Sequence, residues 1–387
     1  MTHTIHLPVS AGRTEAHTVG APGEFTPPCS PLRSRIAYAA AHVVADPYAE
    51  NTPGSPPVPD WERTLAFRHE LWRWGFGVAE AMDTAQRGMG LDWPTAAELI
   101  RRSAAEARTV GARIVAGVAT DQLTTARPTL SQVADAYLEQ LAVAEEAGAT
   151  PVIMASRHLV RAATTADDYL AVYDKVIGQA SGPVVLHWLG EMFDPQLSGY
   201  WGARDLDAAS ETVLSLIHAH SSRIDGIKLS LLDAERERGL RGRLPDGVRM
   251  YTGDDFNYCE LIRGDERGHS DALLGVFAAI APAASQALQA LDAGDLAGYE
   301  RAMAPTVPLG RHLFEAPTYH YKTGVAFLAW LNGHQDHFRM LNGAQSGRSL
   351  LHLAKLFRLA DRAGVLCDPD LAVARMKAFL RVNGVEA

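Results

Sequence analysis

The chain has 387 residues, 47% of them hydrophobic and 21% charged, which is a composition typical of a globular protein. Asp and Glu number 45 against 36 Lys and Arg, so the formal net charge is −9, and no basic stripe indicates nucleic-acid binding. No apolar run approaches the roughly 20 residues that span a bilayer, so we expect no membrane contact. The three cysteines are scattered and the N-terminus lacks a signal-peptide pattern, so we expect a cytoplasmic protein without disulfides.

The chain falls into three stretches of different pattern. Residues 1–33 are rich in Thr, Gly, Pro and Ser, which predicts an irregular arm. Across residues 34–281, short apolar runs of strand type alternate with segments of helical spacing, and this happens eight times. We place the strands at residues 34–43, 76–81, 113–118, 150–155, 182–188, 223–230, 248–251 and 272–277. This alternation predicts the α/β fold class, as a (β/α)8 TIM barrel. Residues 282–387 predict a helical segment packed on the barrel.

A lysine interrupts one of the most apolar of these strands. Lys228 lies between Ile227 and Leu229 in the run from Arg223 to Ser230. An ammonium group is seldom fully buried unless it is paired or neutralised. Burial lowers the pKa of a lysine, and the neutral amine is a nucleophile that forms a Schiff base with ketones and aldehydes. The alternative is a lysine at a strand end that reaches solvent.

Polar residues gather where the other predicted strands end. In a barrel of this kind, catalytic groups lie at the carboxyl ends of the strands. These positions hold His42, Glu80 with Asp83, Asp121, Arg157 with His158, His187 with Glu191, and Asp254 with Asp255 and Asn257. His187 ends the strand before Lys228 and suits the proton transfers of Schiff-base chemistry. Asp254 and Asp255 also fit a helix cap.

The order of four motifs resembles one family of class I aldolases. They are Ala144–Ile153, Gly182–His187, Asp225–Ser230 with Gly-Ile-Lys, and Tyr251–Asp255 with Gly-Asp-Asp. Over about residues 34–300 the chain resembles the dihydrodipicolinate synthase and N-acetylneuraminate lyase family, and is closest to a branch known only as a domain of unknown function. The resemblance implies that Lys228 forms the imine, that the fold is a barrel with a C-terminal helical segment, and that the protein assembles as a homo-oligomer, as is frequent in the family. We expect no cofactor and no metal ligand.

Two departures from the family pattern bear on the substrate. The family has a tyrosine where this chain has His187, and a Gly-Thr-Thr-Gly-Glu loop where this chain has residues 80–86, Glu-Ala-Met-Asp-Thr-Ala-Gln. Carboxylates accept hydrogen bonds and repel other carboxylates, so Glu80 and Asp83 favour sugar-like hydroxyls. We therefore expect a Schiff-base aldolase or lyase acting on a hydroxylated carbonyl compound, sugar-derived or a keto acid. Its substrate-binding residues are predicted to be Glu80, Asp83, His42, Glu191, Asp254, Asp255 and Asn257, and its catalytic residues Lys228 and His187.

Two other functions fit the same residues. In a metal-dependent isomerase, epimerase or aldolase, Glu80, His187, Glu191 and either Asp254 or Asp255 would hold a divalent ion. A barrel that only binds a sugar-like ligand is the second alternative. The clusters at 320–323, which contains Lys322, and at 334–338, which contains two histidines, are interpreted as loop or subunit-contact features.

Overall fold

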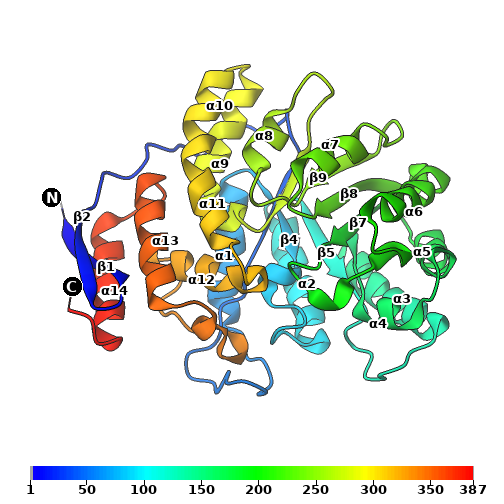
Figure 1. The fold of residues 1–387 in the computed structure, drawn as a ribbon, viewed down its shortest axis with the longest axis horizontal. Helices are drawn as coiled ribbons and strands as arrows, with labels where there is room; N and C mark the ends of the chain where they lie inside the picture. The colour runs from blue at the N-terminus through cyan, green and yellow to red at the C-terminus, as the bar shows by residue number, and fades with distance from the viewer. Residues whose placement is uncertain (1–2, 387) are drawn as a thin grey trace.

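The computed structural model describes residues 3–386 and contains a closed barrel of eight parallel strands (Figure 1). The strands follow one another around the barrel in chain order, and β10 closes it by pairing with β3. They are β3 (Ala37–Ala40), β4 (Gly77–Glu80), β5 (Ile114–Val118), β6 (Thr150–Met154), β7 (Val184–Leu189), β8 (Ile224–Ser230), β9 (Arg249–Thr252) and β10 (Asp271–Leu274). The predicted (β/α)8 barrel is confirmed.

Helices cover the outside of the barrel between successive strands. They are α1 (Trp61–Arg73), α2 (Trp93–Thr109), α3 (Leu130–Ala147), α4 (Arg157–Ala162), α5 (Ala166–Gln179), α6 (Leu206–Ala219), α7 (Ala234–Arg241), α8 (Tyr258–Arg263) and α9 (Phe277–Asp292). Local sequence sets their ends. In α3, Thr129 and Gln132 form a capping box, and Gly148 ends the helix in the left-handed conformation at φ +79°.

The barrel interior is filled by side chains that alternate along the strands. Tyr38, Val152, Val185 and Tyr251 belong to this inner cluster. Gly226 makes room for one of the rings, because a Cβ there would lie 2.7 Å from the ring of Tyr251. The interior is therefore a packed core with aromatic rings on two of its strands, and it is not an open channel.

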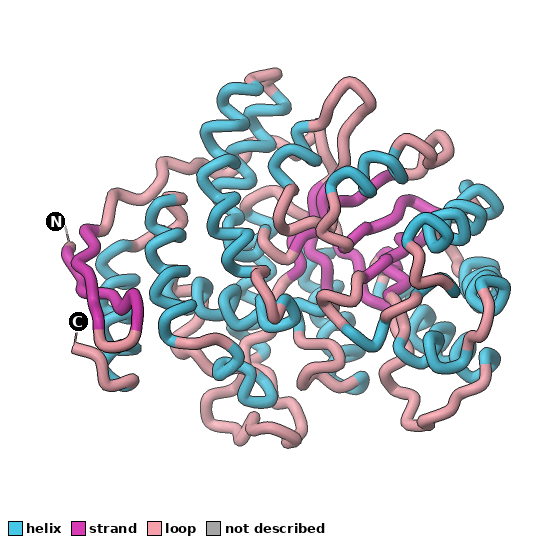
Figure 2. The backbone as a smooth tube through the Cα atoms, viewed as in Figure 1, coloured by secondary structure: helices cyan, strands magenta, loops and turns pink. Residues whose placement is uncertain are grey.

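The N-terminal arm differs from the prediction. Its first part is an antiparallel hairpin of β1 (Thr4–Ser10) and β2 (Arg13–Thr18), visible as magenta strands beside the C-terminal helices in Figure 2. Ile5 and Leu7 are fully buried, and the guanidinium of Arg358 donates a 2.9 Å hydrogen bond to the Leu7 carbonyl. The expectation of an irregular arm was wrong for residues 4–18, because contact with a distant helix stabilises a hairpin whose own pattern is weak.

The C-terminal part is helical, as expected. It contains α10 (Leu296–Met303), α11 (Val307–Leu313), α12 (Tyr321–Leu331), α13 (Leu350–Arg362) and α14 (Pro369–Val382). Almost every residue of α12 is buried, so this helix forms the centre of the extension. The boundary placed at residue 281 falls inside α9, which bends at Ile280 and continues past Pro282 as one helix. Within residues 3–386, no helix combines the length and apolarity that crossing a bilayer requires.

Candidate active site

Lys228 lies inside the barrel near the carboxyl end of β8. Its neighbours in register are His187 on β7 and Tyr251 on β9, so the three side chains share the inner face. The lysine is 7% exposed. A Cβ on Gly253, just beyond β9, would lie 2.8 Å from Cε of Lys228 and would overlap Oγ of Ser230. The glycine of the Gly-Asp-Asp motif therefore provides the space that the lysine side chain occupies.

The environment of Lys228 favours its neutral form. Burial lowers the pKa of Lys228, and the carboxylates of Asp83 and Asp255 oppose this effect from a distance. Among residues 3–386, no carboxylate forms an ion pair with its amine. A desolvated amine without a close counter-ion is a stronger nucleophile at neutral pH than an exposed lysine, because more of it is unprotonated.

His187 is fully buried beside this lysine. Its Nε2 lies 3.2 Å from Oγ of Ser230, and its Nδ1 has no hydrogen-bond partner within the described part of the chain. Burial, together with the charge of Lys228, lowers the pKa of His187 well below 6.5. His187 is therefore a neutral imidazole at neutral pH, with one nitrogen facing Ser230 and the other unpaired.

The two adjacent aspartates have different roles. Burial raises the pKa of Asp255 to about 8, although the backbone N–H of Val276 donates to its Oδ1 at 2.8 Å and Lys228 lies nearby. Asp254 instead accepts hydrogen bonds from the backbone N–H groups of Phe256 and Asn257. The side chain of Asn257 also donates to Asp254 at 2.9 Å. Asp254 and Asn257 thus hold the turn into α8, and only Asp255 acts on the lysine.

Of the seven residues predicted to bind substrate, only Asp83 lines the cavity described below, and three of the others lie away from Lys228 as well as from the cavity. Both oxygens of Glu80 accept 2.8 Å hydrogen bonds from the guanidinium of Arg68, and both side chains are fully buried. Nε2 of His42 lies 2.8 Å from Oε1 of Gln335, and burial lowers the pKa of His42 to about 3. Glu191 is exposed in the loop after β7. The same contacts argue against the metal site predicted from Glu80, His187, Glu191 and Asp254 or Asp255. Glu80 is paired with Arg68, and Glu191 faces solvent.

A cavity of about 320 Å³ opens among the loops that follow β4, β5, β6 and β7. Its wall is formed by Asp83, Arg87, Gly88, Met89, Ala119, Thr120, Asp121, Met154, Ala155, Ser156, Arg157, His158, Arg161, Leu189, Phe193, Asp194, Leu197, Tyr319, Tyr321 and Lys322. Lys228 is not part of the wall. However, Met154 of the wall is the register partner of His187, and His187 is the register partner of Lys228. The three residues therefore lie at the same level along the barrel axis.

Asp83 connects the cavity with the buried lysine. It lies in the single 3-10 turn η1 (Asp83–Ala85), which follows β4, and its side chain is half-buried in the cavity wall. The negative charge of Asp83 raises the pKa of both Lys228 and Lys322, against the larger effect of burial on each. Within the described residues neither lysine is hydrogen-bonded to Asp83, so its carboxylate is available to a ligand.

Sequence reasoning missed the role of Lys322. This residue is 3% exposed in the first turn of α12, where its Nζ donates to the carbonyl of Tyr319 at 3.0 Å and lies 3.2 Å from Sδ of Met89. Burial lowers its pKa to about 8. The expectation that Lys322 lies in a solvated loop was wrong, because the residue is buried in a helix. The available signal was the wholly apolar run after it, residues 324–331, which is typical of a buried helix.

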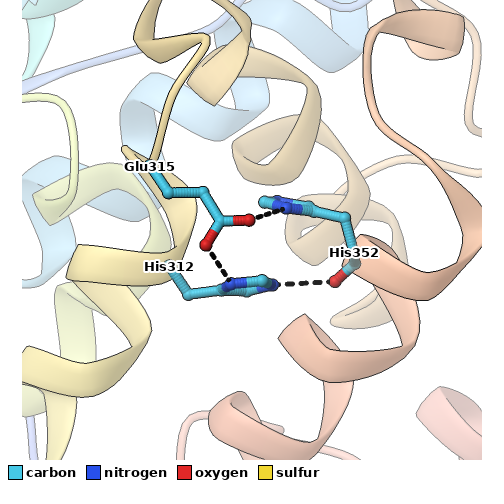
Figure 3. A group of neighbouring side chains, drawn as sticks. All are labelled: His312, Glu315 and His352. Carbon is cyan, nitrogen blue, oxygen red and sulfur yellow. Dashed lines mark hydrogen bonds and ion pairs between the residues drawn. The ribbon is translucent and has the colours of Figure 1, made fainter. Parts of the chain in front are cut away.

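A cluster of two histidines and one glutamate joins α11 to α13 (Figure 3). The carboxylate of Glu315 lies 3.0 Å from Nδ1 of His312 and 2.9 Å from Nδ1 of His352. Nε2 of His312 donates to the backbone carbonyl of His352 at 2.9 Å, and the two rings stack at 4.0 Å with 22° between their planes. Nearly parallel rings do not direct their nitrogen lone pairs to one point, so this arrangement is an interhelical link and not a preformed metal site.

Comparison with solved structures places the fold. Dihydrodipicolinate synthase from Aquifex aeolicus aligns with 91% of this chain and 98% of its own, at a TM-score of 0.62 and 13% identity. The enzyme from Bacillus clausii aligns with 84% and 97%, at a TM-score of 0.61 and 16% identity. A prophage protein of the dihydrodipicolinic acid synthase family from E. coli K12, solved in complex with pyruvate, aligns with 91% and 99%, at a TM-score of 0.61 and 15% identity.

The barrel therefore has the fold of the dihydrodipicolinate synthase family, as the motifs predicted. The chain itself belongs to the family described as "Protein of unknown function (DUF993)", whose model matches residues 5–385. This agrees with the predicted branch of unknown function. A search of the curated proteins found no match to the chain.

Proposed function

We propose that this protein is a Schiff-base-forming aldolase or lyase that acts on a hydroxylated carbonyl compound, sugar-derived or a keto acid. The observation that carries the proposal is Lys228, a buried amine without an ion-pair partner in residues 3–386, at the carboxyl end of a barrel strand. The similarity of the fold to dihydrodipicolinate synthase, and to a prophage protein of that family solved in complex with pyruvate, supports this class of reaction.

The groups around Lys228 suit the formation of an imine. The neutral amine adds to the substrate carbonyl, which gives a carbinolamine after one proton moves from nitrogen to oxygen. Loss of water then requires a proton on the departing hydroxyl. Asp255, with its pKa raised to about 8, carries such a proton at neutral pH. The product is an iminium on Lys228, which withdraws electrons from the adjacent C–C bond.

His187 is proposed to move protons in the later steps. As a neutral imidazole with an unpaired Nδ1, it can accept a proton on one nitrogen while the other donates to Ser230. The metal-dependent function has less support, because two of its four predicted ligands are not available. Glu80 is paired with Arg68, and Glu191 is exposed to solvent.

The test is reductive trapping. The protein is incubated with sodium borohydride and each of a panel of keto acids and ketoses, and its intact mass is measured. We expect a covalent adduct in wild type and in the exposed-lysine control Lys355→Ala, and none in Lys228→Ala. The chain has only five lysines, so peptide mapping assigns the adduct without ambiguity.

An adduct of equal yield in Lys228→Ala would overturn the proposal. So would the absence of any adduct together with a divalent metal that co-purifies and is required for turnover, since that result supports the metal-dependent function. The mass added in wild type also identifies the carbonyl fragment.

A further inference from the structure

The cavity wall contains a buried amine, Lys322, that no carboxylate in residues 3–386 pairs with. Lys322 forms no ion pair with any residue between 3 and 386: its Nζ contacts a neutral carbonyl and a thioether, and lies 5.0 Å from the centroid of the Tyr321 ring. A thioether is a weak acceptor, so at least one N–H of this amine lacks a strong partner. A buried cation in this condition is costly unless a ligand supplies the missing negative charge.

A second cation lies close to Lys322. The Nε of Arg157 donates to Asp194 at 2.5 Å, while its two terminal nitrogens donate to no group in the described residues. The charge of Arg157 lowers the pKa of Lys322, which places the two cations in one electrostatic neighbourhood. The segment Gly88–Met89 connects them: Met89 contacts Lys322, and a Cβ on Gly88 would lie 3.6 Å from Nη1 of Arg157.

Two other arginines lie at this wall, and Arg161 donates to Oε1 of Gln196 at 2.6 Å. Arg87 directs its nitrogens to Asp121, to Gln140, and to the carbonyls of Ala81 and Gly117, so it has no capacity left for a ligand. Among the described residues, unengaged cationic donors of the wall therefore remain at Lys322, at Arg157 and at the exposed Arg161, and Lys322 is the buried one. These donors are suited to an oxyanion, because charge-assisted hydrogen bonds to carboxylate or phosphate are the strongest available to them.

We propose that Lys322 and Arg157 bind a carboxylate or phosphate group of the substrate, and thereby hold its carbonyl toward Lys228. This inference rests on the proposed Schiff-base function and narrows its substrate to anionic carbonyl compounds. It differs from the expectation drawn from sequence, in which Glu80 and Asp83 exclude carboxylates. Glu80 is neutralised by Arg68, and Asp83 lies among cations.

The first experiment compares matched carbonyl compounds in the trapping reaction. Pyruvate is paired with hydroxyacetone, and dihydroxyacetone phosphate with dihydroxyacetone, so that each pair differs by the anionic group. In wild type the anionic member should reach half-maximal trapping at a concentration at least about tenfold lower. The pair that shows the difference identifies carboxylate or phosphate as the bound group.

The variants assign this preference to Lys322. Lys322→Met keeps the length and apolar stem of the side chain and removes its charge, so it should erase the preference for the anionic compound over its uncharged partner. Lys322→Arg should restore part of the preference. An unchanged preference in Lys322→Met, with a circular dichroism spectrum like wild type, would overturn the inference.

A second experiment separates failure of this inference from failure of the proposed function. Oxalate and inorganic phosphate have no reactive carbonyl, and their binding to the full chain is measured by calorimetry in wild type, Lys228→Ala and Lys322→Met. Binding that survives in Lys228→Ala and is lost in Lys322→Met supports the anion site, whether or not an imine ever forms.

Binding should also weaken as the pH rises through about 8, where Lys322 loses its proton. No binding of either ion at any pH in this range would overturn the inference.

Discussion

Two sets of buried charges lie near the carboxyl ends of the barrel strands, and they differ in what they leave unpaired. On one side, Arg68 and Glu80 satisfy each other completely, with both side chains excluded from water. On the other, the half-buried Asp83 raises the pKa of the buried Lys228 and Lys322 without forming an ion pair with either in residues 3–386. Glu80 and Asp83 are only three residues apart. Residue type alone therefore does not identify a candidate active site here. The absence of a charge partner is what distinguishes the candidate site from the Arg68–Glu80 pair.

The largest expected effect concerns the paired side of this comparison. Glu80→Gln leaves the guanidinium of Arg68 buried without its counter-ion, so we expect the free energy of unfolding to fall by about 3–5 kcal/mol. Asp83→Asn is the matched control three residues away, and it should change stability by less than about 1 kcal/mol while altering imine trapping. Denaturant unfolding measures both variants. Equal losses of stability in the two variants would contradict the statement that Glu80 is ion-paired and Asp83 is not.

An intermediate effect is expected at Gly253, which borders the unpaired side. Gly253→Ala puts a methyl group 2.8 Å from Cε of Lys228 and against Oγ of Ser230, so the lysine must move. We expect the rate of borohydride trapping to fall by about tenfold, since small displacements of a reacting group are costly. Gly182→Ala serves as control, because no heavy atom lies within 4 Å of its added carbon. A trapping rate like wild type in Gly253→Ala would contradict this role for the glycine.

The smallest effect is expected in the histidine cluster of the C-terminal helices. Burial lowers the pKa of His352 to about 4 from 6.5, so the folded protein binds this proton less readily than the unfolded chain. Burial tends to raise the pKa of Glu315, but hydrogen bonds with His352 and His312 lower it overall. The shift of His352 means that stability present above pH 6.5 is lost as the pH falls toward 4, whereas the shift of Glu315 removes stability only as the pH falls below 4.5.

His352→Gln removes the titrating imidazole, and should make the decrease of Tm between pH 7 and pH 4 smaller by about 2 °C. Thermal unfolding followed by circular dichroism at each pH provides the measurement. A steeper decrease in the variant than in wild type would show that the sign of this linkage is wrong.

The sequence predicted correctly those features that depend on contacts between neighbouring segments of the chain. Eight apolar strands alternating with helices define the barrel, and the lysine and histidine on consecutive strands meet because parallel strands in register bring them together. The pairing of Asp254 with backbone groups is also local, and a helix cap was one of the two alternatives considered.

The sequence could not show which polar groups are neutralised by distant partners. Glu80 was taken for a ligand-binding residue because nothing near it predicts the approach of Arg68 from α1. Lys322 was taken for a contact residue because its burial depends on α12 packing among the other C-terminal helices. The hairpin at residues 4–18 formed for the same reason, through its contact with α13. Tertiary contacts decided all three cases.

The position of α12 in the chain bears on how the proposed substrate specificity is encoded in the gene. The amine proposed to react lies in the middle of the chain, whereas the amine proposed to hold the anionic group lies in the C-terminal segment, which is a separate stretch of coding sequence. Exchange or gradual change of that segment would alter which acid is accepted without touching the reacting strand.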